Sequence, residues 1–216
     1  MKQATRRGVL FCLCGPTGGG KTFYGLRLLQ AFPDSLSRSI SVTSREPRSG
    51  ETHGQSYYFI SRNEFEHRIA KGEFFEWEEV HGNYYGTLMS TIKSVPVSGK
   101  DLLLIIDIRG ALRVKEAFPE DTVIAFMVPP DFKTLKDRLR ARGKMSNREE
   151  ALRFDTARFE YAKLLENTDR KGHIDYLVIN DEIEPTYAAI SSILQAERAR
   201  LHRIDRDEVE KICHTV

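Results

Sequence analysis

The fold of this 216-residue chain is decided by Gly15-Pro16-Thr17-Gly18-Gly19-Gly20-Lys21-Thr22. This stretch fits G-x-x-x-x-G-K-[ST], follows an apolar run at Val9–Cys14 and opens a helical stretch at Phe23–Ala31, which is the context that a phosphate-binding loop requires. Its glycines let consecutive backbone N–H groups turn inward, and the helix start adds partial positive charge. We expect Lys21 to reach the β- and γ-phosphates of a nucleoside triphosphate and the Thr22 hydroxyl to ligate Mg²⁺. An ordinary glycine-rich turn is the weaker interpretation.

Three more apolar runs have the character of buried strands: Leu102–Asp107, Thr122–Val128 and Ile174–Asn180. Each lies near a stretch with helical spacing. Strands that are buried on both faces and separated by helices predict an α/β fold whose parallel sheet is covered on both sides. Asp131 is expected to cap one helix, which Gly143 would end.

Two segments differ from this pattern. Residues 40–90 are rich in aromatic residues and glycine, which predicts a small mixed β insertion with a short helix around Glu64–Ile69. Residues 133–160 are polar and rich in arginine, which is typical of a mobile lid. Residues 1–39 and 91–195 form the predicted core, which includes this lid. Residues 196–216 are predicted to be a helical extension whose alternating charges face solvent.

The bulk composition excludes several classes of protein. The 33 basic and 31 acidic residues give a net charge of +2, too low for a protein that coats nucleic acid. No apolar run is long enough to span a bilayer, and residues 1–8 lack a signal peptide's apolar stretch. Cys12 and Cys14 point to the same face of a strand, which favours reduced, buried thiols and a cytoplasmic protein. The six histidines show no metal-ligand spacing.

A second anion site is indicated by Arg45 and Arg48, which lie three apart around a proline. Their forked guanidinium groups suit a phosphate. Further on, the stretch Gly82-Asn83-Tyr84-Tyr85-Gly86-Thr87 supplies hydroxyls and glycines that allow close approach. Taken singly, a solvated arginine pair and packed tyrosines are the plainer interpretations.

Several motifs in order resemble the guanylate kinase family over residues 8–195. They are Thr43-Ser44-Arg45-Glu46-Pro47-Arg48-Ser49-Gly50-Glu51, Gly54-x-x-Tyr57, Phe75-Glu76-Trp77, Gly82-Asn83-Tyr84-Tyr85-Gly86-Thr87, Asp107-Ile108-Arg109-Gly110, Arg138-Leu139-Arg140-Ala141-Arg142-Gly143, Arg153 and Val178-Ile179-Asn180-Asp181. The resemblance implies phosphorylation of GMP by ATP with Mg²⁺.

The resemblance also implies roles for single residues. The GMP phosphate would be held by Arg45, Arg48, Tyr57 and Tyr85. The guanine would be read by Ser41, Glu76 and Thr87. Asp107 would lie near the metal and the acceptor. Positive charge from the lid would come from Arg138, Arg142 and Arg153, and Asn180 would lie near the adenine of ATP. The residues expected to act in catalysis are Lys21, Arg45, Arg142 and Arg153.

The chemistry of Glu76 agrees with such a role. Guanine presents N1–H and the 2-amino group as adjacent donors, and a carboxylate only accepts hydrogen bonds. Adenine offers an acceptor at N1 instead, and a mismatch of this kind can discriminate by about 10⁴. A solvated strand residue is the alternative for Glu76. The chain departs from the family at Ile105, where an acidic residue is usual, and at Phe23, where a small hydroxyl residue is common.

Two other functions stay open at this point. One is a kinase for another phosphorylated acceptor, such as a ribose bisphosphate, which would make no use of Glu76 and Ser41. The other is a non-catalytic interaction module of the guanylate-kinase-like type, which typically lacks a working phosphate loop. The expected partners are ATP and GMP, without nucleic acid or membrane, and the protein is expected to be a monomer or a homodimer.

Overall fold

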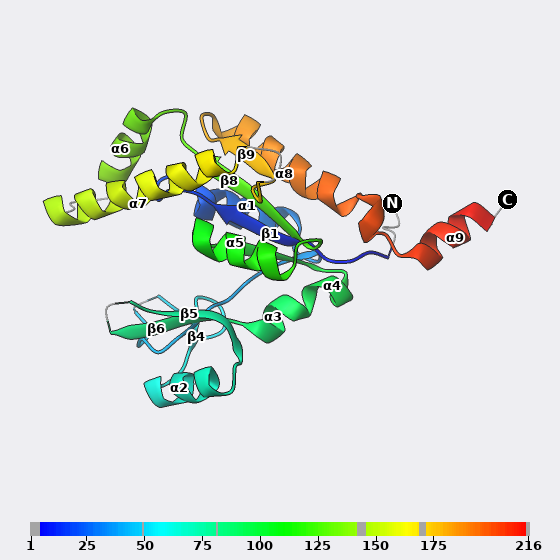
Figure 1. Cartoon of the computed structure of the whole chain (residues 1–216), viewed down its shortest axis with the longest axis horizontal. Helices are drawn as coiled ribbons and strands as arrows, with labels where there is room; N and C mark the ends of the chain where they lie inside the picture. Colours follow the sequence, from blue (N-terminus) through cyan, green and yellow to red (C-terminus); the bar gives the residue numbers. More distant parts are fainter. Residues whose placement is uncertain (1–4, 49, 81, 142–145, 169–171, 215–216) are drawn as a thin grey trace.

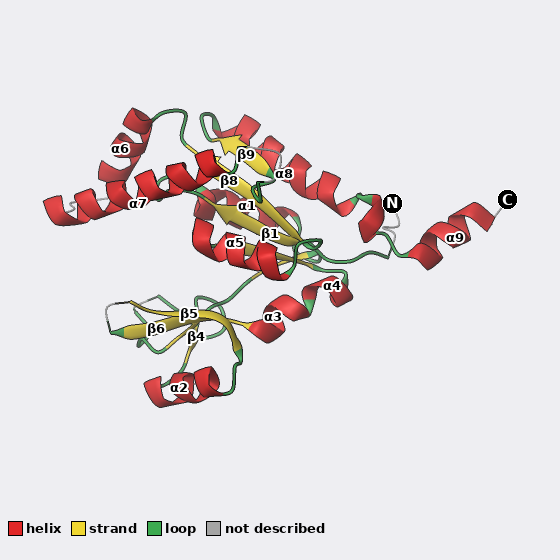
Figure 2. Cartoon of the chain, in the orientation of Figure 1, coloured by secondary structure: helices red, strands yellow, loops and turns green. Residues whose placement is uncertain are grey.

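The structure is a computed structural model that describes residues 5–48, 50–80, 82–141, 146–168 and 172–214. Its larger part is a five-stranded parallel sheet between layers of helices (Figure 1, Figure 2). The spatial order of its strands is β2 (Leu36–Arg38), β7 (Asp101–Ile105), β1 (Leu10–Cys14), β8 (Thr122–Val128) and β9 (Tyr176–Ile179). The predicted α/β class with a covered parallel sheet is confirmed.

The central strand β1 shows why helices cover both faces of this sheet. Its residues are all buried and point alternately to opposite faces. Phe11 and Leu13 belong to one apolar cluster, whereas Cys12 and Cys14 belong to the other, as predicted for the two thiols. One face is covered by α1 (Lys21–Ala31) and α8 (Ile183–Arg198). The other face is covered by α3 (Met89–Lys93), α4 (Val95–Ser98), α5 (Ile108–Ala117) and α7 (Asn147–Glu166).

The ends of two strands differ from the prediction. Strand β7 ends at Ile105 rather than at Asp107, because Asp107 is the N-cap of α5 and its carboxylate accepts a hydrogen bond from the Gly110 N–H at 2.8 Å. Strand β9 begins at Tyr176, two residues later than expected. The short edge strand β2 was not predicted.

A second sheet forms a smaller lobe within residues 40–90 (Figure 1). Its strands are, in order, β4 (Tyr58–Phe59), β3 (Val42–Thr43), β6 (Asn83–Leu88) and β5 (Phe74–Val80). The β3–β4 pair is parallel and the other pairs are antiparallel, so the predicted mixed sheet is confirmed. Helix α2 (Arg62–Ala70) packs on it through Phe65, which stacks on Phe74 with ring centroids 4.2 Å apart. The limits of the predicted domains stay predictions.

The predicted lid contains two helices, α7 and α6 (Phe132–Arg140). Asp131 caps α6 as expected, and its carboxylate accepts a hydrogen bond from the Thr134 N–H at 2.6 Å. Leu135 and Leu139 of α6 pack against Ala157 of α7 in a small apolar cluster of their own. Gly143, the expected end of α6, lies outside the described residues.

The C-terminal segment is attached to the body by buried charges. It continues from α8 through the short helix η1 (Leu201–Arg203) to α9 (Arg206–His214), which projects from the molecule (Figure 1). The expectation of solvated charges is wrong for Glu197, Arg198 and Arg203, which are buried. The reason is long-range pairing: Arg198 Nε donates to Asp101 at 2.6 Å. On α9 the expectation is confirmed, because Arg206 pairs with Glu210 one turn away at 2.8 Å.

Candidate active site

The phosphate loop connects the C-terminal end of β1 to the first residue of α1, as the motif predicts. Gly20 has a φ of +96°, and a Cβ atom there would lie 2.4 Å from the Asn180 side chain. Gly15 has a φ of +118°, and a Cβ atom there would lie 2.2 Å from the Met127 carbonyl oxygen. Only glycine fits both positions, since each combines a left-handed backbone with a close neighbour. The loop is therefore tightly packed against β8 and the end of β9.

Lys21 folds back onto this loop. Its ammonium group donates to the Gly15 carbonyl oxygen and, at 3.1 Å, to that of Pro16. These two carbonyl oxygens hold the Lys21 ammonium group beside the loop, and a bound phosphate can replace them as its hydrogen-bond acceptor. The Thr22 side chain, one residue further, is exposed at the start of α1. Both residues lie where a triphosphate bound at the helix N-terminus would meet them.

The Asn180 side chain fixes the loop by hydrogen bonds. Its amide Nδ2 donates to the Gly19 carbonyl oxygen at 3.0 Å, and its Oδ1 accepts from the Tyr24 hydroxyl at 2.8 Å. Arg138 of α6 donates to the Asn180 carbonyl oxygen at 3.0 Å. Asn180 and Arg138 also line a cavity of about 350 Å³ beside Gly18 and Phe23. This cavity adjoins the loop on the side where the adenosine of a bound nucleotide was expected.

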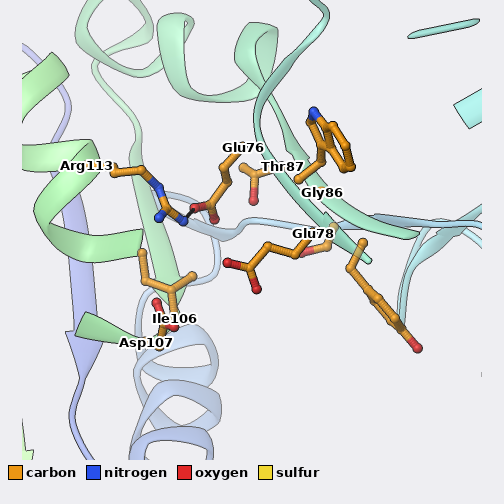
Figure 3. A pocket seen from close by; sticks show the side chains of 10 residues that line it. Glu76, Glu78, Gly86, Thr87, Ile106, Asp107 and Arg113 are labelled. Carbon is orange, nitrogen blue, oxygen red and sulfur yellow. Dashed lines mark hydrogen bonds and ion pairs between the residues drawn. The ribbon is translucent and has the colours of Figure 1, made fainter. Parts of the chain in front are cut away.

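A second pocket, of about 180 Å³, lies between the two lobes (Figure 3). Five of the predicted acceptor residues line it: Ser41, Glu76, Tyr85, Thr87 and Asp107. The strand register explains two of them. Glu76 on β5 lies directly opposite Thr87 on β6, so both side chains stand on the same face of the sheet. A β-bulge between Phe74 and Glu76 shifts the register at this point.

Glu76 has a partner in the core lobe. The Arg113 guanidinium of α5 donates a hydrogen bond to Oε2 of Glu76, and Figure 3 shows it reaching across the pocket. The carboxylate is mostly buried, whereas the arginine remains partly exposed. Trp77 forms part of the pocket wall and is not in the core.

The residues predicted to hold the acceptor phosphate gather around Arg45. Its Nε donates to the Tyr85 hydroxyl at 3.2 Å, and its Nη2 donates to both oxygens of Glu51 at 2.9 Å. The Tyr57 ring lies edge-on to the Tyr85 ring, with centroids 5.9 Å apart. Arg48 joins through its backbone N–H, which donates to Glu51 at 2.8 Å, while its side chain is exposed. That bond and the Arg45 charge hold the pKa of Glu51 below its usual value.

Asp107 lies where two cavities meet. It lines the acceptor pocket and also a cavity of about 280 Å³ whose wall includes Asp155, Phe159 and Glu160 of α7. The neighbouring Ile105 belongs to the apolar core, where it packs toward Gly25 of α1. The site therefore has an aliphatic side chain where the family usually has an acid.

Known proteins are similar to this chain in sequence and in fold. The family model described as guanylate kinase matches residues 7–197. The guanylate kinase of Geobacter metallireducens is 40% identical over 199 residues, which cover 92% of this chain and 94% of the relative. The chain belongs to the guanylate kinase family. The guanylate kinase of Thermotoga maritima is 37% identical, covering 95% of this chain and 94% of that one. The crystal structure of guanylate kinase from Anaplasma phagocytophilum superposes with a TM-score of 0.71 at 31% identity and covers 97% of both chains.

The lid residues that membership of the guanylate kinase family implicates are placed only in part. Arg138 lines the nucleotide-side cavity described above. Arg153 is half-buried on α7 and does not line any of the three cavities described above. Arg142 lies outside the described residues. Tyr57 and Arg48 reach the acceptor site through Arg45 and Glu51 rather than as pocket walls.

Sequence reasoning missed Arg113 and Glu160 in this guanylate kinase fold. No local pattern marks Arg113, because its contact joins two segments 37 residues apart. Glu160 does have a signal. It follows Arg153 by seven residues, which is two helical turns, so the two lie on the same side of α7. That spacing within the arginine-rich lid could have identified it.

Proposed function

We propose that this protein transfers the γ-phosphoryl group of ATP to GMP, giving ADP and GDP. One observation carries the proposal: Ser41, Glu76 and Thr87 come together in a pocket whose wall includes Asp107. The same chain has an intact phosphate loop, and the family model covers most of its length. The acceptor pocket supports guanine as the base, and the phosphate loop supports a nucleoside triphosphate as the donor.

Base selection rests on Glu76. Its carboxylate accepts from N1–H and the 2-amino group of guanine, while a hydroxyl at Ser41 donates to O6. Adenine would bring an acceptor against the carboxylate and leave a largely buried charge badly paired, which can discriminate by about 10⁴. Because Arg113 already holds Oε2, the carboxylate is oriented before the base arrives.

Acceptor binding rests on the cluster around Arg45. A guanidinium that is held by Glu51 and Tyr85 is oriented in advance, so little side-chain entropy is lost when the GMP phosphate binds. Arg48, Tyr57 and Tyr85 complete the grip. The phosphate oxygen of GMP is itself an anionic nucleophile, so the transfer needs positioning and charge stabilisation rather than a side-chain base.

Mg²⁺ fits the donor set that these residues offer. Among the described residues no group of three or more His, Cys, Asp or Glu side chains could hold a metal by itself. Mg²⁺ does not need one, because it binds through one or two carboxylates plus substrate phosphates. Thr22 and Asp107 would hold it. When bound, the ion would neutralise negative charge on the β- and γ-phosphates.

The lid arginines supply the remaining positive charge. Arg138, Arg142 and Arg153 all belong to the predicted lid, and closing that lid would bring them onto the transferring group. Closure also excludes water, which suppresses hydrolysis of ATP. Asn180 keeps the phosphate loop in shape on the adenosine side.

The direct test is ADP release by purified protein with GMP, AMP or a ribose bisphosphate as acceptor. We expect ADP release with GMP that exceeds the release with AMP by orders of magnitude. Lys21→Ala and Arg45→Ala should each lower turnover by orders of magnitude while circular dichroism shows a folded protein. GDP formation near the wild-type rate in either variant would contradict the scheme.

The same assay separates the alternatives. A ribose bisphosphate preferred over GMP would favour the kinase for another phosphorylated acceptor. Failure to bind ATP in the presence of Mg²⁺ would favour the interaction module. The intact loop and the Glu76 pocket both support the GMP kinase instead.

The cellular compartment and the oligomeric state are the last parts of the proposal. In the part of the chain that the structure describes, no helix is long and apolar enough to cross a membrane. The free thiols of Cys12, Cys14 and Cys213 support the cytoplasm that was predicted from the sequence. A monomer or a homodimer remains the expectation.

A further inference from the structure

The lid helix α7 carries a buried carboxylate that has no partner. Glu160 is only 4% exposed, although charged residues are rarely buried unless they are paired. Among the described residues its carboxylate forms no hydrogen bond or ion pair, and its oxygens are not fully enclosed, so they face the cavity that the side chain lines. An unpaired buried charge is costly, so it calls for an explanation.

The surroundings of Glu160 show where its carboxylate can act. It lines the cavity of about 280 Å³ that it shares with Asp107, and Asp107 also borders the acceptor pocket. Lys21 and Asp107 are the charged groups whose fields act on it. Glu160 therefore lies between the phosphate loop and the acceptor site, where the two phosphates must meet. Burial, as the larger cause, and the Asp107 charge raise its pKa to about 7, against the opposing effect of Lys21.

The donor atoms around this cavity are those that Mg²⁺ prefers. Carboxylates from Asp107 and Glu160 line it, and both are hard oxygen groups that can ligate the ion or accept from metal-bound water. The Thr22 hydroxyl does not line this cavity and belongs to the start of α1. Ile105 cannot serve, because it is an aliphatic side chain packed in the core. Glu160 is thus the carboxylate that joins Asp107 in the same cavity while lying on a different element, the lid helix.

We propose that Glu160 is the second carboxylate of the cation site, which accepts hydrogen bonds from water bound to the Mg²⁺ that accompanies ATP. This inference rests on the proposed kinase function. It also gives the lid a means of sensing the cation: α7 gains a charge partner only when the cation and the nucleotide are bound. An orphaned carboxylate in the ligand-free protein becomes a satisfied one in the complex.

The test compares binding of a non-hydrolysable ATP analogue by calorimetry at pH 8, with Mg²⁺ and with EDTA. Glu160→Gln keeps the shape of the side chain and removes the charge. We expect the variant to bind the analogue about tenfold more weakly with Mg²⁺, the usual effect of removing such an outer partner, and unchanged in EDTA. Mn²⁺ binding in the presence of the analogue, followed by electron paramagnetic resonance, should weaken in parallel.

The matched control is Asp155→Asn. Asp155 lines the same cavity from the same helix, but it is exposed and pairs with Arg158 at 3.0 Å, so its loss should leave the Mg²⁺ dependence unchanged. The inference would be overturned if Mg²⁺ raised the affinity of Glu160→Gln for the analogue as much as it raises that of the wild type. An equal loss of affinity with Mg²⁺ and with EDTA would also overturn it, because Glu160 would then act on Lys21 and not on the cation. If the wild-type protein itself gains nothing from Mg²⁺, the proposed function fails as well, which distinguishes the two failures.

Discussion

Replacing Asp101 by Asn should destabilise the protein severely. The Asp101 side chain is 0% exposed. Its two oxygens accept from Arg6 at 2.7 and 2.9 Å and from Arg198 at 2.6 Å, and Oδ1 also accepts from the Val9 N–H at 2.8 Å. Asparagine keeps the shape but loses the charge, and its amide turns a donor toward guanidinium groups that also donate.

The magnitude follows from the burial of the partners. The side chains of Arg6 and Arg198 are only 7% and 8% exposed, so neither can recover its hydration in place. Removing one partner of a buried ion pair costs about 3–5 kcal/mol. We therefore expect the free energy of unfolding to fall by about 4 kcal/mol, which lowers Tm by roughly 8–16 °C in a protein of this size.

The measurement is urea denaturation followed by circular dichroism, with a thermal scan alongside. Glu184→Gln is the control, because it breaks the Arg27–Glu184 pair, whose side chains are 29% and 72% exposed. Such an exposed pair contributes less than about 1 kcal/mol. If Asp101→Asn costs no more than this control, the Asp101 cluster does not stabilise the fold and the reasoning is wrong.

Three more predictions concern the site. Arg113→Met should raise KM for GMP about tenfold with little change in kcat, because the Glu76 carboxylate loses its fixed orientation; an unchanged KM in steady-state kinetics would make the contact a surface feature. Tyr24→Phe should lower the free energy of unfolding in urea by about 1–3 kcal/mol and weaken ATP binding, since the buried Asn180 oxygen loses its donor. An unchanged urea midpoint would show that the Tyr24–Asn180 hydrogen bond does not stabilise the loop. Glu160 has a pKa raised from 4.5 to about 7, so the folded state holds its proton more tightly than the unfolded state. The free energy of unfolding of the ligand-free protein should therefore fall by roughly 3 kcal/mol as pH rises from 4.5 to 7, and Glu160→Gln should lack this fall. The same pH dependence of unfolding in both proteins would contradict the prediction.

The sequence predicts the features that depend on local chemistry. The alternation of Phe11, Cys12 and Leu13 within an apolar run is sufficient to define a strand buried on both faces. The loop that follows has few possible conformations, since its glycines and the helix start determine its course. The acceptor motif around Glu76 places side chains on one face through strand periodicity, and the structure brings them together in one pocket.

Features that depend on distant partners could not be predicted. Alternating charges after residue 195 look the same whether they pair along a helix or with Asp101, which is 97 residues away from Arg198. Strand β2 has only one buried residue, Leu36, so its three residues carry too little pattern. The spacing of Glu160 from Arg153 places it on the same side of α7, but its burial depends on packing that this spacing does not show.

The cluster around Asp101 also has a consequence for synthesis on the ribosome. Arg198 is synthesised 97 residues after Asp101, and Arg203, whose carbonyl oxygen accepts from the Arg7 N–H, follows it. Until Arg198 has been made, the Asp101 carboxylate of a nascent chain has Arg6 as a partner but lacks its second guanidinium group. The sheet can therefore reach its final stability only after Arg198 and Arg203 have been synthesised, which favours folding as a unit.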